Sequence, residues 1–170
     1  MVASMGQSEL RKHRRYLAKA EQAEVALISL SPEVVKGARE AWQLALAAAG
    51  DFATDLYAAL FELSPTSANL FPGDLSEQRR RLTATLIQTM DLLEEPEDLV
   101  LLLKASGARH LHYGTQYEHF PVLGRALIQT LERRLRHSFT DEHRKAWESV
   151  YKNMADVMSG AIALAQLERA

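Results

Sequence analysis

Apolar residues recur at intervals of three and four along most of the chain, the pattern of helices that bury one face. No stretch alternates apolar and polar residues as a half-buried strand would, and no sequence repeat is present. The pattern therefore predicts an all-α protein with about six substantial helices and one short helix, joined by short loops.

Cap and turn residues mark the ends of these helices. Ser31 and Pro32 supply an N-cap and a first-turn proline, Gly50 ends that helix, and Thr140 is a good N-cap for the last one. We expect helices over 8–30, 32–50, 51–63, 75–94, 97–108, 120–135 and from 140 onward. The inward positions include Val35, Ala38, Trp42 and Leu46, then Leu75, Leu82, Leu86, Met90 and Leu93, and then Leu99, Leu102, Leu103 and Ala105.

Three polar residues, Tyr57, Gln78 and His110, fall on otherwise apolar helix faces. A buried glutamine amide costs free energy unless its donors find acceptors. His110 lies at the end of a helix that Gly114 breaks, where one ring nitrogen can bond a carbonyl oxygen one turn back and the other can bind iron. The alternative for His110 is a buried histidine with a purely structural hydrogen bond. An axial imidazole, with two hydrogen-bond donors across the pocket, explains all three residues together.

Composition excludes several classes of protein. A chain of 170 residues with 47% apolar and 25% charged residues is most simply one globular domain. The net charge of −2 gives no reason to expect nucleic acid as a partner. The absence of cysteine excludes disulfides, thiolate metal sites and covalent haem attachment. No apolar run approaches the roughly 20 residues that span a bilayer, and no signal-peptide core is present, so we expect a cytoplasmic protein.

The segment 1–30 is expected to be a partly helical extension that precedes the main domain, 31–170. Its first helical turns are basic, whereas Glu21 and Glu24 dilute the charge further along. A basic helix can contact a membrane surface. We favour a solvated extension or a contact between two copies in a homodimer.

Several motifs follow one another in a fixed order. Trp42 precedes Leu56-Tyr57-Ala58-Ala59-Leu60-Phe61, Leu70-Phe71 and Glu77-Gln78-Arg79-Arg80-Arg81-Leu82. Arg109-His110 precedes Tyr113-Gly114, His119-Phe120-Pro121-Val122-Leu123-Gly124 and, near the end, Ala146-Trp147 with Tyr151. Over roughly residues 31–165 this order resembles the globins, in particular bacterial single-domain globins similar to the globin half of flavohaemoglobins.

The resemblance implies a three-on-three helical globin fold that holds haem b between the helices bearing Gln78 and His110. It makes His110 the proximal iron ligand and Tyr57 with Gln78 the distal pair. The other implied haem contacts are Phe71 on the haem face, Leu82 as distal wall, Arg81 and Arg109 near the propionates, and Tyr113 and Phe120. His112 is expected to contact solvent or a propionate and not the iron. The implied function is reversible binding of oxygen, and also of CO and NO.

Two positions depart from the flavohaemoglobin pattern, in which a tyrosine and a glutamate back the proximal histidine. This chain has Phe120 and Ile162 at those places, and neither side chain can accept the imidazole proton. A non-enzymatic oxygen binder is therefore expected. The alternatives are an NO dioxygenase that uses a separate reductase, a gas or redox sensor acting through the N-terminal segment, and a globin-like module without haem.

Overall fold

The computed structural model describes residues 5–169, and all of its regular structure in that range is helical. The α-helices are α1 (Gln7–Ile28), α2 (Pro32–Ala47), α3 (Phe52–Leu63), α4 (Ser76–Asp91), α5 (Pro96–His112), α6 (His119–Leu135) and α7 (Asp141–Arg169). Short 3-10 helices lie at η1 (Pro65–Leu70), η2 (Leu92–Glu94) and η3 (Arg136–Ser138). The predicted all-α fold is confirmed.

Ser31 and Thr140 cap the N-termini of α2 and α7, as predicted. The Ser31 hydroxyl accepts a hydrogen bond from the backbone N–H of Val34 at 3.3 Å, and Pro32 is the first residue of α2. The Thr140 hydroxyl accepts from the N–H of His143 at 3.2 Å, at the start of α7. Local side-chain chemistry therefore sets these two starts.

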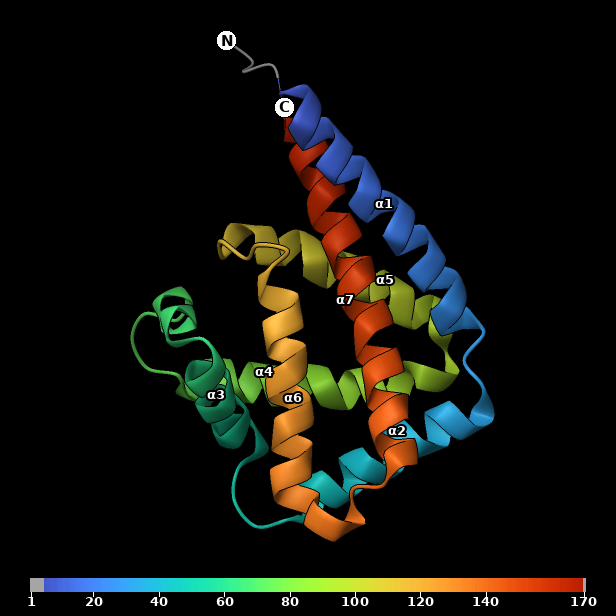
Figure 1. The fold of residues 1–170 in the computed structure, drawn as a ribbon, viewed down its shortest axis with the longest axis vertical. Coiled ribbons are helices and arrows are strands. Elements are labelled where there is room, and N and C mark those ends of the chain that lie inside the picture. Colours follow the sequence, from blue (N-terminus) through green and yellow to red (C-terminus); the bar gives the residue numbers. More distant parts are fainter. Residues whose placement is uncertain (1–4, 170) are drawn as a thin grey trace.

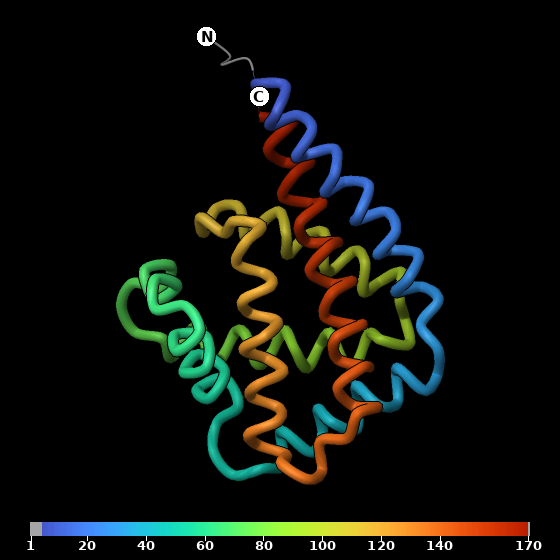
Figure 2. The backbone as a smooth tube through the Cα atoms, in the orientation of Figure 1, coloured from blue at the N-terminus to red at the C-terminus, as the bar shows by residue number. Residues whose placement is uncertain are grey.

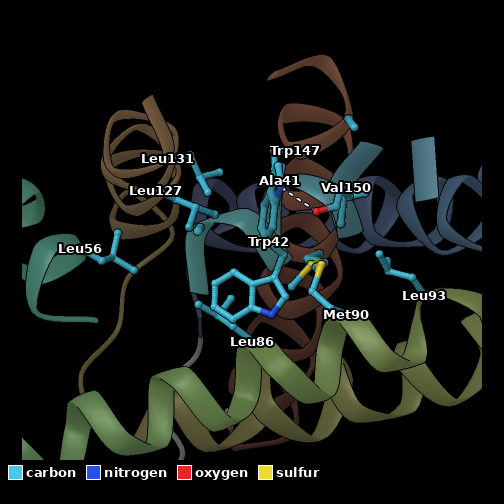
Figure 3. Close-up of a cluster of buried hydrophobic side chains, with 14 of the residues drawn as sticks. Ala41, Trp42, Leu56, Leu86, Met90, Leu93, Leu127, Leu131, Trp147 and Val150 are labelled. Atoms are coloured by element: carbon cyan, nitrogen blue, oxygen red, sulfur yellow. Dashed lines mark hydrogen bonds between the residues drawn. The ribbon is translucent and has the colours of Figure 1, made fainter. Parts of the chain in front are cut away.

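The helices form two crossing layers. In Figure 1, α6 and α7 run from top to bottom in front of α4 and α5, which run across the view. Helix α5 packs on α7, α3 packs on α6, and α2 packs on both α6 and α7. At the centre, Trp42 and Trp147 lie among aliphatic side chains of α3, α4 and α6 (Figure 3). The Trp147 indole N–H donates to Ala38 O at 3.0 Å, which satisfies the polar atom of a fully buried ring.

Two predicted core positions are wrong. Leu46 is 41% exposed, and the buried stripe of α2 continues through Ala45 instead. Helical periodicity explains this, because Ala38, Ala41, Trp42 and Ala45 follow the three-and-four spacing that keeps residues on one face. Ala105 on α5 is also exposed, while Leu99 and Leu103 are buried as expected.

Two arginines cap the ends of helices other than their own. Arg134 of α6 donates from Nη2 to the carbonyl oxygens of Ala45, Ala48 and Gly50 at 2.9–3.1 Å, and it also pairs with Asp55. Arg39 of α2 donates to Met90 O at 3.0 Å and to Asp91 O at 3.1 Å, at the end of α4. The last carbonyls of a helix lack partners within it, so these contacts satisfy both helix ends.

Helix α1 lies along the C-terminal half of α7, antiparallel to it, and the two helices project together from the rest of the molecule (Figure 2). Ala20, Ala23 and Leu27 of α1 are buried. Gly160 makes this close approach possible, because a Cβ there would lie 2.2 Å from Ala20 Cβ. The segment expected as an extension is thus packed on the main body over its described part, while residues 1–4 lie outside the described residues.

Among the described helices, none alone is long and apolar enough to cross a membrane. Helices α2 and α3 meet the length and hydropathy criteria only as a pair, across a bend of 102°.

Candidate functional site

His110 lies in the last turn of α5, which begins at Pro96 with Glu97 and Asp98 in its first turn. Its Nδ1 lies 2.7 Å from the carbonyl oxygen of Ser106, one turn earlier. A carbonyl can only accept, so Nδ1 carries the proton and Nε2 has the free lone pair. The hydrogen bond expected one turn back is present, and it leaves the second nitrogen available to a metal.

The surroundings of the His110 ring are mainly aromatic and apolar. The Phe120 ring centroid lies 6.4 Å from that of His110, and Phe120 is buried. Tyr113 meets the imidazole edge-on at 6.1 Å but is 56% exposed. Ile162 is fully buried in the same small cluster as Phe120. Phe120 and Ile162 are the two positions that depart from the flavohaemoglobin pattern. They lie in one buried cluster, and Phe120 is the member next to the imidazole.

Tyr57 projects from α3 into an aromatic group. Its ring lies edge-on to Phe71 at 5.1 Å and tilted against Phe61 at 5.9 Å, and the side chain is only 7% exposed. Within the described residues its hydroxyl has no hydrogen-bond partner. Burial raises the pKa of this phenol, and the nearby positive charge of Arg79 acts in the opposite direction. The hydroxyl is thus a protonated and uncommitted donor.

Gln78 and Leu82 lie one turn apart on α4, as expected, but both are half-buried and not buried. The buried residues of α4 are Leu86, Thr89 and Met90, in its C-terminal half. Trp42 of α2 packs in the same core cluster as Leu86 and Met90. The sequence pattern thus assigned the correct face of α4 but extended its burial too far toward the N-terminus.

The residues proposed near the propionates are all exposed. Arg81 pairs with Glu77 at 2.9 Å, and Arg80 pairs with the same carboxylate at 2.7 Å. Arg109 donates to the Ser106 hydroxyl at 3.1 Å. His112 Nε2 lies 3.4 Å from Nη2 of Arg169.

Sequence reasoning missed Arg79, whose charge acts on Tyr57, Asp51 and Asp74. A signal was available, because Arg79 follows Leu75 by four residues and precedes Leu82 by three. That spacing places it on the inward side of α4 and not on a fully solvated face.

The structure thus contains two groups of candidate residues. His110, Tyr113 and Phe120 surround the end of α5, whereas Tyr57 and Phe71 contact each other beside the start of α4. An imidazole with one committed and one free nitrogen suits haem iron, and a phenol whose hydroxyl bonds to no described protein group suits a polar ligand. The residues present fit haem.

Comparison with known proteins agrees with this fit. The family model described as Globin matches residues 54–158. A flavohemoprotein of Rhizobium meliloti is 29% identical over 107 residues, which are 61% of this chain and 27% of that protein. A flavohemoprotein of Deinococcus radiodurans is 29% identical over 120 residues, 68% of this chain and 30% of the relative.

A third similar protein, a flavohemoprotein of Chromobacterium violaceum, is 24% identical over 107 residues, 61% of this chain and 26% of the relative. The matched part of the chain therefore spans less than a third of the length of each of these bacterial relatives. The match covers the helices that carry both groups of candidate residues. The chain therefore belongs to the globin family, whose members bind haem and, at its iron, diatomic gases.

Proposed function

We propose that this globin binds haem b through His110 and reversibly binds oxygen, and also CO and NO. When bound, haem supplies a ferrous iron that coordinates diatomic gases reversibly. The observation that carries the proposal is the hydrogen bond of 2.7 Å between His110 Nδ1 and Ser106 O. It fixes the tautomer and ring orientation, so that Nε2 is the nitrogen offered to the iron.

Tyr57 and Gln78 are proposed as the donors to the gas ligand. The raised pKa of Tyr57 keeps its hydroxyl protonated at neutral pH, so it can donate. A gas that gains negative charge on binding is stabilised by donors aimed at it, each worth about 1.5–3 kcal/mol. Residues proposed to contact the porphyrin are Phe71, Leu82, Tyr113 and Phe120.

Arg81, Arg109 and His112 are proposed to meet the haem propionates. Arginine suits a carboxylate because its planar fork forms bidentate, charge-assisted hydrogen bonds. Arg81 can leave Glu77 at little cost, since Arg80 stays paired with that carboxylate through two nitrogens. Exposed ion pairs of this kind contribute about 0–1 kcal/mol each.

The side chains of Phe120 and Ile162 near His110 favour reversible ligand binding over oxidative chemistry. Phe120 and Ile162 cannot accept a proton, and among residues 5–169 the imidazole N–H is backed by the Ser106 carbonyl and not by a carboxylate. A carbonyl leaves the imidazole less basic than a charged acceptor would, which weakens electron donation to the iron.

A second candidate function is NO dioxygenation with electrons from a separate reductase. The similarity to flavohemoproteins favours it. Sustained NO consumption with an added reductase would support this function, whereas a single decay of the oxygenated form on adding NO would not. We further propose a cytoplasmic location, and α1 as the segment through which two copies or a signalling partner would meet.

The distal assignment is tested by oxygen dissociation from Tyr57→Phe. Loss of one hydrogen bond worth about 1.5–3 kcal/mol should raise the dissociation rate constant about ten- to a hundredfold, as measured by stopped-flow mixing. Tyr113→Phe is the matched control, because Tyr113 lies beside His110 and its rate should stay within a factor of two of wild type (roughly 0.4 kcal/mol). Equal rates in wild type and Tyr57→Phe would contradict the assignment.

A further inference from the structure

The turn that follows His110 is bonded directly to the backbone of that residue. His110 O accepts hydrogen bonds from the N–H groups of Tyr113 at 3.1 Å and Thr115 at 3.3 Å. Gly114 makes this turn with a φ of +74°, a conformation that favours glycine. Two residues after Thr115 the chain reaches Tyr117, which is buried. A short path therefore joins Tyr117 to the backbone of His110, through Thr115 and its hydrogen bond to His110 O.

Tyr117 is held from two sides by elements far away in the sequence. Its hydroxyl donates to Oε1 of Gln166 on α7 at 2.8 Å. Its ring stacks on that of Tyr16 on α1, with centroids 3.7 Å apart and planes 20° apart. Burial raises the pKa of Tyr117 to about 12, so the hydroxyl stays a donor across the neutral range.

Gln166 extends the same network back to α1. Its Oε1 also lies 2.7 Å from Nε2 of His13, and Nδ1 of His13 lies 2.6 Å from Glu9 O. His13 is buried, although it lies in the most basic part of the chain. One amide oxygen therefore joins the first turns of α1, the last turns of α7 and the turn that follows His110.

A cluster of apolar side chains connects the same elements as this hydrogen-bond network. Tyr117, Phe120 and Ile162 share one buried cluster, and Tyr16 and Leu17 of α1 pack against it. Phe120 is also the residue whose ring lies 6.4 Å from the His110 imidazole. Helix α1 thus reaches the surroundings of His110 by two routes, one through Tyr117 and one through Phe120.

We propose that α1 positions the proximal histidine, and that Tyr117 is the positioning residue through which it does so. The inference rests on the proposed role of His110 as iron ligand. The turn is bonded to His110 O, and Tyr117 joins it to α7 by a hydrogen bond and to α1 by ring stacking, so a displacement of α1 that disturbs Tyr117 shifts the backbone of His110 and with it the imidazole.

The test compares Tyr117→Phe, which keeps the stacked ring and removes the hydroxyl, with wild type. Gln166→Leu removes the acceptor of the same hydrogen bond and should change hydrogen exchange in the same segments in the same direction. The matched control is Thr130→Val, which also removes a buried hydroxyl bond, from Thr130 Oγ1 to Ala126 O, within α6. In Tyr117→Phe, hydrogen exchange over 9–17 and 111–118 should rise together by about fivefold to tenfold, whereas the control keeps wild-type exchange there.

The second readout is the iron–histidine stretching band of the reduced, haem-loaded protein in resonance Raman spectra. It should shift or broaden in Tyr117→Phe and stay in place in Thr130→Val. Wild-type exchange in the turn, or an unmoved band in a loosened turn, would overturn the proposal. If the protein takes up no haem, that result contradicts the proposed function alone. The ring-nitrogen resonances of His110 in NMR spectra then replace the Raman band, and their shift in Tyr117→Phe but not in Thr130→Val decides the positioning role.

Discussion

At the scale of single residues, the two nitrogens of His110 have different neighbours. Nδ1 is committed to Ser106 O, and Nε2 is free for a metal. The sequence could predict this bond because donor and acceptor lie one helical turn apart. It could also predict that Tyr57 is buried, since the residue lies on the inward stripe of a strongly apolar helix.

Other residue assignments depended on partners that the sequence does not show. Gln78 lies on the expected face of α4, yet its burial depends on where other helices cross α4. Arg79 differs from Arg80 and Arg81 in its helical spacing from Leu75 and Leu82, but the sequence does not show which groups each arginine meets. In the structure Arg80 and Arg81 share Glu77, whereas the charge of Arg79 acts on Tyr57.

A prediction at this scale concerns Asp51, the N-cap of α3, whose Oδ2 accepts from the N–H of Thr54 at 2.8 Å. The hydrogen bond from the Thr54 side chain holds the pKa of Asp51 below its ordinary value of 3.8. A lowered folded pKa means that the stabilisation is complete above the unfolded pKa and is lost as the pH falls through the folded one.

Asp51→Ala should therefore lower the free energy of unfolding by about 1 kcal/mol at pH 7, and by less below pH 4. Asp51→Asn is the control, because asparagine keeps a cap without a titrating carboxyl. Urea unfolding at several values between pH 7 and 3 gives the measurement. A loss in Asp51→Ala that is the same at every pH would show that the charge of Asp51 contributes nothing.

At the scale of helices, the sequence pattern placed each of the seven within a few residues, because caps and periodicity are local. It missed the interactions that join one helix to another. Arg134 lies more than 80 residues from the carbonyls it caps in α2, and nothing near it in the sequence signals them. Arg39 lies 51 and 52 residues from the carbonyls of Met90 and Asp91 at the end of α4, and nothing near it in the sequence signals them either.

A second prediction compares two adjacent arginines of α6. The Arg134 side chain is almost fully buried and bonds three carbonyls as well as Asp55, whereas Arg133 pairs with Glu62 in solvent. Arg134→Met should lower the free energy of unfolding by about 3–5 kcal/mol, because it leaves helix-end carbonyls and a carboxylate without their partner. Arg133→Met should lower it by less than about 1 kcal/mol. Similar losses for the two variants in urea unfolding would contradict the capping role of Arg134.

At the scale of the whole molecule, the resemblance in motif order supplied the globin fold, which periodicity alone could not distinguish from other helical arrangements. The match of the Globin family model over residues 54–158 confirms it. The place of α1 could not be predicted, because its docking depends on Gly160 and on small side chains such as Ala20 and Ala23. Such residues carry little signal in a hydrophobic pattern. The packing of α1 along α7 is consequently the largest feature that the sequence pattern did not predict.

The central claim is that His110 holds the iron of a bound haem, and absorbance spectra test it most directly. Purified wild type, His110→Ala and His137→Ala would be titrated with haem, reduced, and exposed to oxygen and CO. His137 is the matched control, since it is exposed and is not among the proposed haem contacts. We expect a Soret band and stable oxygen and CO complexes for wild type and His137→Ala, and their loss in His110→Ala. A wild type that takes up no haem, or an unchanged spectrum in His110→Ala, would contradict it.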